Sequence, residues 1–242
     1  MTNTEFEQLF LHFCSKNSIK APTTEQIEQF YTFTEHLLTV NQATNLTAIR
    51  DVPSTITKHY LDSLLALDLI PQGARVLDIG CGPGFPTLPL AIVRQDIRIT
   101  ALDSTQKKIN FVAESANLLH LSNVEAVSAR AEDHDVLKKL GSFDVVISRA
   151  VARLNILCEL ALPYVATNGT MIAMKAAKAD EELDVARNAI KILGGDTPTV
   201  HRSLFFTSDE TEEERALICI KKIKQTPPLY PRPFATIKKK EL

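Results

Sequence analysis

From residue 75 onward, short runs of strand-forming residues alternate with segments of helical periodicity. This alternation constrains the fold strongly, because parallel strands need crossover connections, and helices then cover both faces of the sheet. The predicted strands are RVLDI (75–79), RITALD (98–103), VEAVSA (124–129), FDVVISR (143–149) and GTMIAMK (169–175). Helical segments between them include 105–120, 154–165 and 180–194. We therefore predict an α/β fold built on five parallel strands.

The end of the chain breaks this rhythm. Two further strand-like runs, TPTVHRSLFF (197–206) and RALICIKKI (215–223), are separated only by the polar segment TSDETEEE. That connection is too short for a crossover helix, so the two runs are predicted to form an antiparallel hairpin. The expected architecture is a seven-stranded, mostly parallel, Rossmann-like sheet with a C-terminal antiparallel hairpin.

The N-terminal part of the chain has helical periodicity instead. Apolar residues recur at one-turn spacing between Phe6 and Phe13. A second helix is predicted to begin at Thr23, with Gln26 completing a capping box, and a third covers ITKHYLDSLLALDL (56–69). We expect three parts: an N-terminal helical extension (1–70) packed on the core, a ligand-binding core (71–224), and a basic, proline-containing C-terminal tail (225–242).

Bulk properties limit the classes of partner. A formal net charge of −2 at pH 7 gives no whole-molecule attraction to nucleic acid or membranes, so a polyanion would have to meet a local basic patch. No apolar run approaches the roughly 20 residues of a membrane span, and no signal peptide is evident. The four cysteines are far apart, without the paired spacing of zinc sites. We expect a cytoplasmic protein with reduced thiols, no metal and no membrane contact.

Three glycines alternate in LDIGCGPGFPTLPLA (77–91), directly after the first predicted strand. Ligands of doubly wound sheets bind at this turn, where bare backbone allows close approach and the next helix offers N–H donors. Gly80, Gly82 and Gly84 are therefore candidate contacts. The alternative is a tight turn that needs glycine only for its dihedral angles.

The glycine spacing does not fit the common nucleotide motifs. A dinucleotide fingerprint needs a third glycine where this chain has Phe85 or Thr87. Pro83 and Pro86 lack N–H groups that a pyrophosphate would need. The Gly-Lys-Ser/Thr signature of a P-loop is absent as well. Because the acid Asp78 precedes the glycines, the loop favours a phosphate-free ligand with an amino-acid end, and an NAD(P) oxidoreductase is disfavoured.

A second acid, Asp103, ends the second predicted strand. An ionised carboxylate there can accept both hydroxyl groups of a ribose. Aspartate is also a favoured helix cap, and both interpretations stay open. After the third strand, Ala131 and Glu132 are placed to flank an adenine. A ligand with ammonium, carboxylate, ribose and adenine groups but no phosphate is S-adenosylmethionine.

The core resembles the class I S-adenosylmethionine-dependent methyltransferases, whose parallel sheet also ends in a hairpin. Several stretches, in order along nearly the whole chain, are similar to the bacterial small-subunit (16S) ribosomal RNA guanine-N7 methyltransferases of the glucose-inhibited-division B family. These stretches are NLTAI (45–49), KHYLDSL (58–64), LDIGCGPGFPTLPLAI (77–92), LDS (102–104) with Lys107 and Lys108, ARAE (129–132), ISRAVA (147–152) and TPPLYPR (226–232).

This resemblance implies methylation of guanine N7 in the decoding-region loop of 16S ribosomal RNA, with S-adenosylmethionine as cofactor and the small ribosomal subunit or its RNA as partner. It carries cofactor contacts onto Gly80, Phe85, the Ala131–Glu132 pair and Arg149, and it matches Asp103 to the ribose-binding acid of the class. The full set of predicted cofactor contacts is Asp78, Gly80, Gly82, Gly84, Phe85, Asp103, Ala131, Glu132 and Arg149.

The chemistry of N7 fits the segment after the fourth strand. Guanine N7 has a lone pair and no proton, so its methylation needs alignment rather than a general base. The segment reads Ser-Arg-Ala-Val (148–151), without the Asp/Asn-Pro-Pro-aromatic motif of amine methylation and without a nucleophilic cysteine. Arg149 is the one predicted catalytic residue, the alternative being an arginine paired with a surface acid. His59 either packs in the core or contacts RNA phosphate.

A basic C-terminal run is the candidate RNA-binding surface, although a solvated tail is the alternative. The tail reads YPRPFATIKKKEL where the family commonly has a Gly-Pro-type ending, which leaves its RNA contacts open. We expect a monomer. Methylation of another RNA or of a small molecule, or RNA binding without catalysis, are the other possibilities. The candidate residues are Lys221, Lys222, Lys224, Arg232, Lys238, Lys239 and Lys240.

Overall fold

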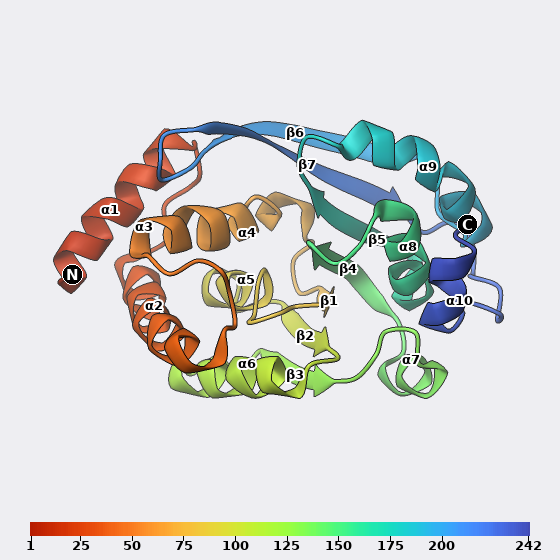
Figure 1. The fold of residues 1–242 in the computed structure, drawn as a ribbon, viewed down its shortest axis with the longest axis horizontal. Helices are drawn as coiled ribbons and strands as arrows, with labels where there is room; N and C mark the ends of the chain where they lie inside the picture. Colours follow the sequence, from red (N-terminus) through yellow and green to blue (C-terminus); the bar gives the residue numbers. More distant parts are fainter.

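The computed structural model describes residues 1–242 and contains one seven-stranded sheet (Figure 1). The strand order is β3-β2-β1-β4-β5-β7-β6. Strands β1 to β5 pair in parallel, and β7 runs antiparallel to both β5 and β6. This arrangement confirms the predicted fold. The strands are β1 (Arg75–Ile79), β2 (Arg98–Asp103), β3 (Val124–Ser128), β4 (Phe143–Arg149), β5 (Val165–Lys175), β6 (Thr199–Phe206) and β7 (Glu212–Lys221).

The strand order reverses beside β1, and this reversal fixes where a ligand can bind. The chain moves outward from β1 through β2 to β3, and then returns to the other side of β1 with β4. Where strand order reverses, the carboxyl ends of neighbouring strands open a crevice. The segments that follow Ile79 in β1 and Arg149 in β4 therefore meet at the same edge of the sheet.

Helices cover both faces of the sheet, and each face has its own apolar core (Figure 1). Alternate residues of β4 serve the two cores, with Val145 and Ile147 in one and Val146 in the other, as the two-residue period of a strand requires. The first core contains α5 (Thr87–Val93) and α6 (Gln106–Leu118), and the second contains α7 (His134–Leu140), α8 (Leu154–Ala161), the 3-10 turn η3 (Leu162–Tyr164) and α9 (Ala179–Ile192).

The N-terminal helices extend the first core. They are α1 (Asn3–Lys16) and α2 (Thr24–Thr44), and each begins with a capping box. Their buried aromatic side chains join those around the sheet, and the ring centroids of Phe33 and Phe85 lie 5.6 Å apart. The N-terminal helices and the sheet therefore share one continuous core on this face.

The third predicted helix is not a regular α-helix. Residues 52–69 form α3 (Val52–Ser54), the π-helical segment η1 (Thr55–Leu61), α4 (Asp62–Leu64) and the 3-10 turn η2 (Leu67–Leu69). The predicted helix is therefore confirmed for residues 56–64, but it is π-helical over most of that length and ends before residue 69. This segment makes a distant contact that local periodicity does not register, because the carbonyl of Lys58 accepts a hydrogen bond from Arg149 Nη1 at 2.8 Å. Such π-helical turns are frequent at functional sites.

The C-terminal residues form a packed element rather than a solvated tail. The helix α10 (Phe234–Lys239) contacts α8, and Ile237 is buried. Arg232 donates hydrogen bonds from its backbone N–H, Nε and Nη2 to the carboxylate of Glu159, at 2.6–2.9 Å. Glu159 is fully buried in α8, so this ion pair fixes the path of the chain into α10.

The structure contains neither a membrane-spanning helix nor a cluster of metal-ligating side chains. None of the helices combines the length and the apolar character needed to cross a membrane. No three His, Cys, Asp or Glu side chains are grouped so that they could hold a metal ion.

Arg232→Ala is expected to lower the free energy of unfolding by about 3–5 kcal/mol, because it leaves the buried Glu159 carboxylate without its partner. Urea unfolding measures the change. Arg187→Ala is the matched control, since both side chains of the Arg187–Asp184 pair are 73% exposed and such a pair contributes less than about 1 kcal/mol. Equal losses in the two variants would contradict a packed C-terminal element.

Candidate active site

The glycine loop leaves β1 and turns at the carboxyl edge of the sheet. Gly80 and Gly82 have φ angles of +70° and +56°, which glycine adopts without strain. A Cβ atom at Gly80 would also overlap Cγ2 of Val151, whereas one at Gly82 would meet nothing within 4 Å. The loop therefore needs glycine for its backbone angles and, at Gly80, for close packing of the segment that follows β4.

The N–H groups of this loop are all used inside the protein. Those of Gly80 and Cys81 donate to the carbonyl of Leu102 at 2.7 and 3.2 Å, and that of Gly82 donates to the Asp103 carboxylate. The N–H groups of residues 84, 85, 87 and 88 also have partners within the loop or on Asp78, and residues 83 and 86 are prolines. The expectation of free donors here was wrong, because every N–H group of the loop already has a partner inside the protein.

Asp78 lies behind the loop and is fully buried. Its Oδ2 accepts hydrogen bonds from the N–H and the hydroxyl of Thr87 at 3.2 and 2.6 Å, while its Oδ1 has no partner. Burial raises the pKa of Asp78 to about 7, against the smaller lowering effect of the Thr87 hydrogen bonds. Asp78 thus supports the loop and keeps one unused acceptor at the end of β1.

A cavity of about 350 Å³, which we call the smaller cavity, opens beside the glycine loop. Residues from the ends of β1 and β2 and from the segment after β3 form its walls. These elements come from distant parts of the sequence and meet because the sheet is parallel. The structure brings together four of the predicted cofactor contacts here: Gly80, Asp103, Ala131 and Glu132.

Asp103 organises the wall of the smaller cavity. Its Oδ2 accepts the N–H of Gly82 at 3.1 Å, and its Oδ1 accepts the N–H of Thr105 at 2.8 Å. The N-cap residue of α6 is Thr105 rather than Asp103. Because a carboxylate has about four acceptor positions, the half-buried Asp103 keeps capacity for a ligand after making both contacts.

Sequence reasoning missed two apolar side chains of the smaller cavity, Leu160 of α8 and Phe234 of α10. The Arg232–Glu159 ion pair and a hydrogen bond from Asn155 to Glu241, at 2.9 Å, hold α10 beside α8. The only local signal was an aromatic residue in an otherwise basic tail. Its contact depends on a partner far away in the sequence, which no local pattern indicates.

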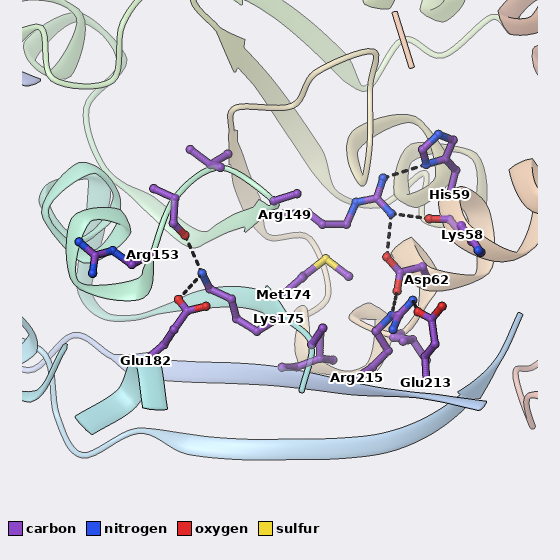
Figure 2. A pocket seen from close by; sticks show the side chains of 16 residues that line it. Lys58, His59, Asp62, Arg149, Arg153, Met174, Lys175, Glu182, Glu213 and Arg215 are labelled. Carbon is purple, nitrogen blue, oxygen red and sulfur yellow. Dashed lines mark hydrogen bonds and ion pairs between the residues drawn. The ribbon is translucent and has the colours of Figure 1, made fainter. Parts of the chain in front are cut away.

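A second cavity, which we call the larger cavity, lies at the carboxyl ends of β4 and β5 and has a volume of about 680 Å³. Figure 2 shows the side chains that line it. Arg149 crosses one wall, where Nη1 donates to Asp62 Oδ2 at 2.7 Å and Nη2 to His59 Nδ1 at 3.2 Å. Asp62 is 7% exposed and also accepts Arg215 Nε at 2.6 Å. Arg149 is thus paired with a buried acid rather than a surface one, and it lines the larger cavity instead of the smaller one.

His59 is held neutral beside Arg149. A guanidinium group can only donate, so Nδ1 of His59 is the acceptor and its Nε2 donates to Thr47 Oγ1 at 2.9 Å. Burial, and then the charge of Arg149, lower the pKa of His59 to about 3. Its ring stacks on Phe85 with centroids 4.2 Å apart. The Phe85 side chain is buried and lines neither cavity, so it supports the site from the core.

Ala150 and Val151, directly after β4, line both cavities. Ala150 has a left-handed φ of +57°, which costs a non-glycine residue about 1–2 kcal/mol. Val151 packs over Gly80, and Lys175 Nζ donates to the carbonyl of Ala152 at 2.6 Å. One short, strained segment therefore forms the boundary between the two cavities.

The seven basic residues predicted to meet RNA differ in their surroundings. Lys222 is buried, its Nζ donates to the carbonyl of Leu162 at 2.6 Å, and burial lowers its pKa to about 8. Arg232 is bound to Glu159. Both side chains are engaged inside the protein and are not free for a phosphate. The other five are exposed: Lys221, Lys224, Lys238, Lys239 and Lys240.

Gly80→Ala and Gly73→Ala separate backbone strain from packing. Their φ angles are +70° and +69°, but a Cβ at Gly73 would meet nothing within 4 Å. Both variants are expected to lose about 1–2 kcal/mol of stability, and Gly80→Ala a further 1–3 kcal/mol or so from its overlap with Val151. Urea unfolding measures both losses, and Val151→Ala should recover part of the second. Equal losses at the two glycines would rule out the packing role.

Comparison of the sequence with known proteins points to one family. The sequence model of the GidB family, described as rRNA small subunit methyltransferase G, matches residues 26–205. A Ribosomal RNA small subunit methyltransferase G from Oceanobacillus iheyensis is 42% identical over 226 residues, which cover 92% of this chain and 93% of the relative. One from Lachnoclostridium phytofermentans is 43% identical over 212 residues and covers 86% of both chains.

Among solved structures, an O-methyltransferase from Bacillus cereus in complex with SAH has a similar fold. The TM-score is 0.56 at 20% identity, covering 91% of this chain and 100% of that one. At this identity the likeness concerns the fold alone. The family follows instead from the sequence matches, which span most of the chain. The chain belongs to the rRNA small subunit methyltransferase G family.

Proposed function

We propose that this protein transfers a methyl group from S-adenosylmethionine to N7 of a guanine in the decoding-region loop of 16S ribosomal RNA. Its relatives, named Ribosomal RNA small subunit methyltransferase G, support the reaction and the substrate. The structural observation that carries the proposal is the pair of cavities separated by Ala150 and Val151. Two adjacent sites at one edge of the sheet are what transfer between two bound molecules requires.

The residues of the smaller cavity fit S-adenosylmethionine. The Asp103 carboxylate can accept ribose hydroxyl groups, and the apolar side chains of Leu160 and Phe234 suit an adenine ring. Gly80 has no side chain that would keep a ligand away from the backbone. Asp78 is fully buried behind the loop and lines neither cavity, so it supports the backbone of the site instead of facing the ligand. When bound, S-adenosylmethionine supplies a methyl group on a positively charged sulfur.

The protein's part in the reaction is alignment. Guanine N7 has a lone pair and carries no proton, so it would accept the methyl group without releasing a proton. No general base is needed, which agrees with His59, whose Nδ1 lone pair is already used by Arg149. The ion pair between Arg149 and Asp62 fixes the end of β4. The methyl donor and the acceptor base must be positioned there with a precision better than about 1 Å.

We further propose that exposed lysines bring the RNA to this edge. Lys238, Lys239 and Lys240 lie in or directly after α10, whose Phe234 lines the smaller cavity. Lys221 and Lys224 are the other exposed members of the set. With a ribosomal substrate, we expect the reaction to take place in the cytoplasm. We propose that the protein acts as a monomer.

Incubation with labelled S-adenosylmethionine and unmodified small subunits tests the proposed function. The expected product is a single N7-methylguanine in the decoding-region loop of 16S RNA. Naked 16S RNA and an unrelated RNA of equal length serve as comparison substrates. Label that appears only in small molecules, or no N7-methylguanine in any RNA, would overturn the proposal.

Asp103→Ala tests the cofactor site. The variant is expected to weaken S-adenosylmethionine binding by about 1.5–3 kcal/mol, the range for hydrogen bonds to a charged group. Isothermal titration measures the affinity, and circular dichroism checks that the variant is folded. Asp184→Ala is the matched control, because Asp184 is exposed and lines neither cavity. Unchanged affinity in folded Asp103→Ala would mean that Asp103 only holds the backbone of residues 82 and 105.

A further inference from the structure

The walls of the larger cavity carry more cationic than anionic side chains, in a chain whose net charge is −2. Its walls carry five cationic side chains and only three carboxylates. Such a local excess attracts a polyanion that the whole molecule does not attract. The cations are Lys58, Arg149, Arg153, Lys175 and Arg215, and the carboxylates are Asp62, Glu182 and Glu213.

Some of these charges are already paired within the protein, and one of them is Arg153, which pairs with Glu241. Both carboxylate oxygens of Asp62 are occupied, one by Arg149 and one by Arg215. Arg215 also pairs with Glu213 at 2.8 Å. These three contacts hold the wall together, and their geometry leaves little capacity for a ligand.

The Lys175–Glu182 pair is different, because each partner keeps free hydrogen-bonding capacity. Lys175 Nζ donates to Ala152 O and to Glu182 Oε2, both at 2.6 Å, and its third N–H has no partner. Glu182 Oε2 also accepts the N–H of Leu154 at 2.7 Å, while Oε1 accepts nothing. The side chains are 11% and 22% exposed, and Figure 2 shows both of them on the cavity wall. The pair thus presents one donor beside one acceptor.

This donor–acceptor pair is complementary to one edge of guanine. Guanine O6 is an acceptor, and the neighbouring N1 carries a proton that can be donated. Adenine has the reverse order, with an amino group at N6 and an unprotonated N1. A lysine ammonium facing adenine N6 would place two donors together, and a carboxylate facing its N1 would place two acceptors together. A fixed pair of this kind therefore rejects adenine.

We propose that Lys175 donates to O6 and Glu182 accepts from N1–H of the target guanine, so that this pair selects the base to be methylated. The inference rests on the proposed function and names residues for its base specificity. N7 lies on the other side of O6 from N1, so these contacts leave its lone pair free. The Lys175–Glu182 pair is also neutral overall, so it does not oppose the positive charge that develops on the methylated base.

Base analogues test this proposal on the wild-type protein. Once the methylated guanine is mapped, ligated 16S RNAs carry hypoxanthine or 2-aminopurine at that position. Hypoxanthine keeps O6 and N1–H, so kcat/KM should fall less than about tenfold. The base 2-aminopurine keeps N7 but lacks both groups, and kcat/KM should fall more than about 1,000-fold, as in sites built around a substrate hydrogen bond. Rejection of hypoxanthine or acceptance of 2-aminopurine would overturn the proposal.

Two variants separate base selection from a structural role. Lys175→Met removes the donor, and Glu182→Gln introduces an amide that can donate as well as accept. Each should narrow the ratio of kcat/KM between guanine and 2-aminopurine by at least about tenfold, the typical value of one base-reading contact. The matched controls are Lys178→Met and Glu181→Gln, which alter exposed neighbours outside the cavity. These controls should leave the ratio unchanged.

A purely structural role predicts a different result. Lys175 and Glu182 also hold the 152–154 segment, and loss of that support would lower kcat/KM for both bases equally and leave their ratio unchanged. Such a result, or variants that behave like their controls, would overturn the proposal. Wild-type protein that forms no N7-methylguanine would refute the proposed function instead. S-adenosylmethionine titration of each variant shows whether the smaller cavity is intact.

Discussion

The buried carboxylate of Asp62 is the contact on which the rest of the site depends. It lies just after the π-helical segment and accepts hydrogen bonds from Arg149 at the end of β4 and from Arg215 in β7. One side chain thus joins the N-terminal segment to two strands of the sheet. A buried carboxylate is tolerated only with such partners, so the three elements are held together or not at all.

By fixing Arg149, Asp62 also positions residues that line both cavities. Arg149 is fixed by Asp62 and by the carbonyl of Lys58, and Ala150 and Val151 follow it directly. Val151 in turn packs over Gly80, where any side chain would collide. The N–H groups of the glycine loop are all engaged within the protein. The loop therefore contributes to the site because Gly80 has no side chain and allows Val151 to pack closely. Methyl transfer needs this kind of rigidity, since misplacement by about 1 Å can cost a factor of 100 in rate.

Much of the fold was predictable from the sequence because the parallel strands are buried on both faces. Predicted bounds for β1, β2 and β4 agree with the structure, since continuous apolar runs indicate such strands. Local sequence patterns did not predict the π-helical turn. Its Lys58 carbonyl accepts a hydrogen bond from Arg149, which lies far away in the sequence at the end of β4. Nor did these patterns predict the role of Phe234, which depends on a buried ion pair between Arg232 and Glu159. Local sequence patterns do not indicate contacts between residues that are far apart in the sequence.

Hydrogen exchange of Asp62→Asn tests the central claim most directly. This substitution keeps the shape of the side chain but removes the charge that pairs with Arg149 and Arg215. We predict a loss of stability of about 3–5 kcal/mol. Amides of residues 55–61 and 149–152 should both exchange faster than in the wild-type protein. Amides of β3 should remain protected relative to these two segments. Unchanged exchange in both segments would contradict the account, because it would mean that they are held in place without the Asp62 carboxylate.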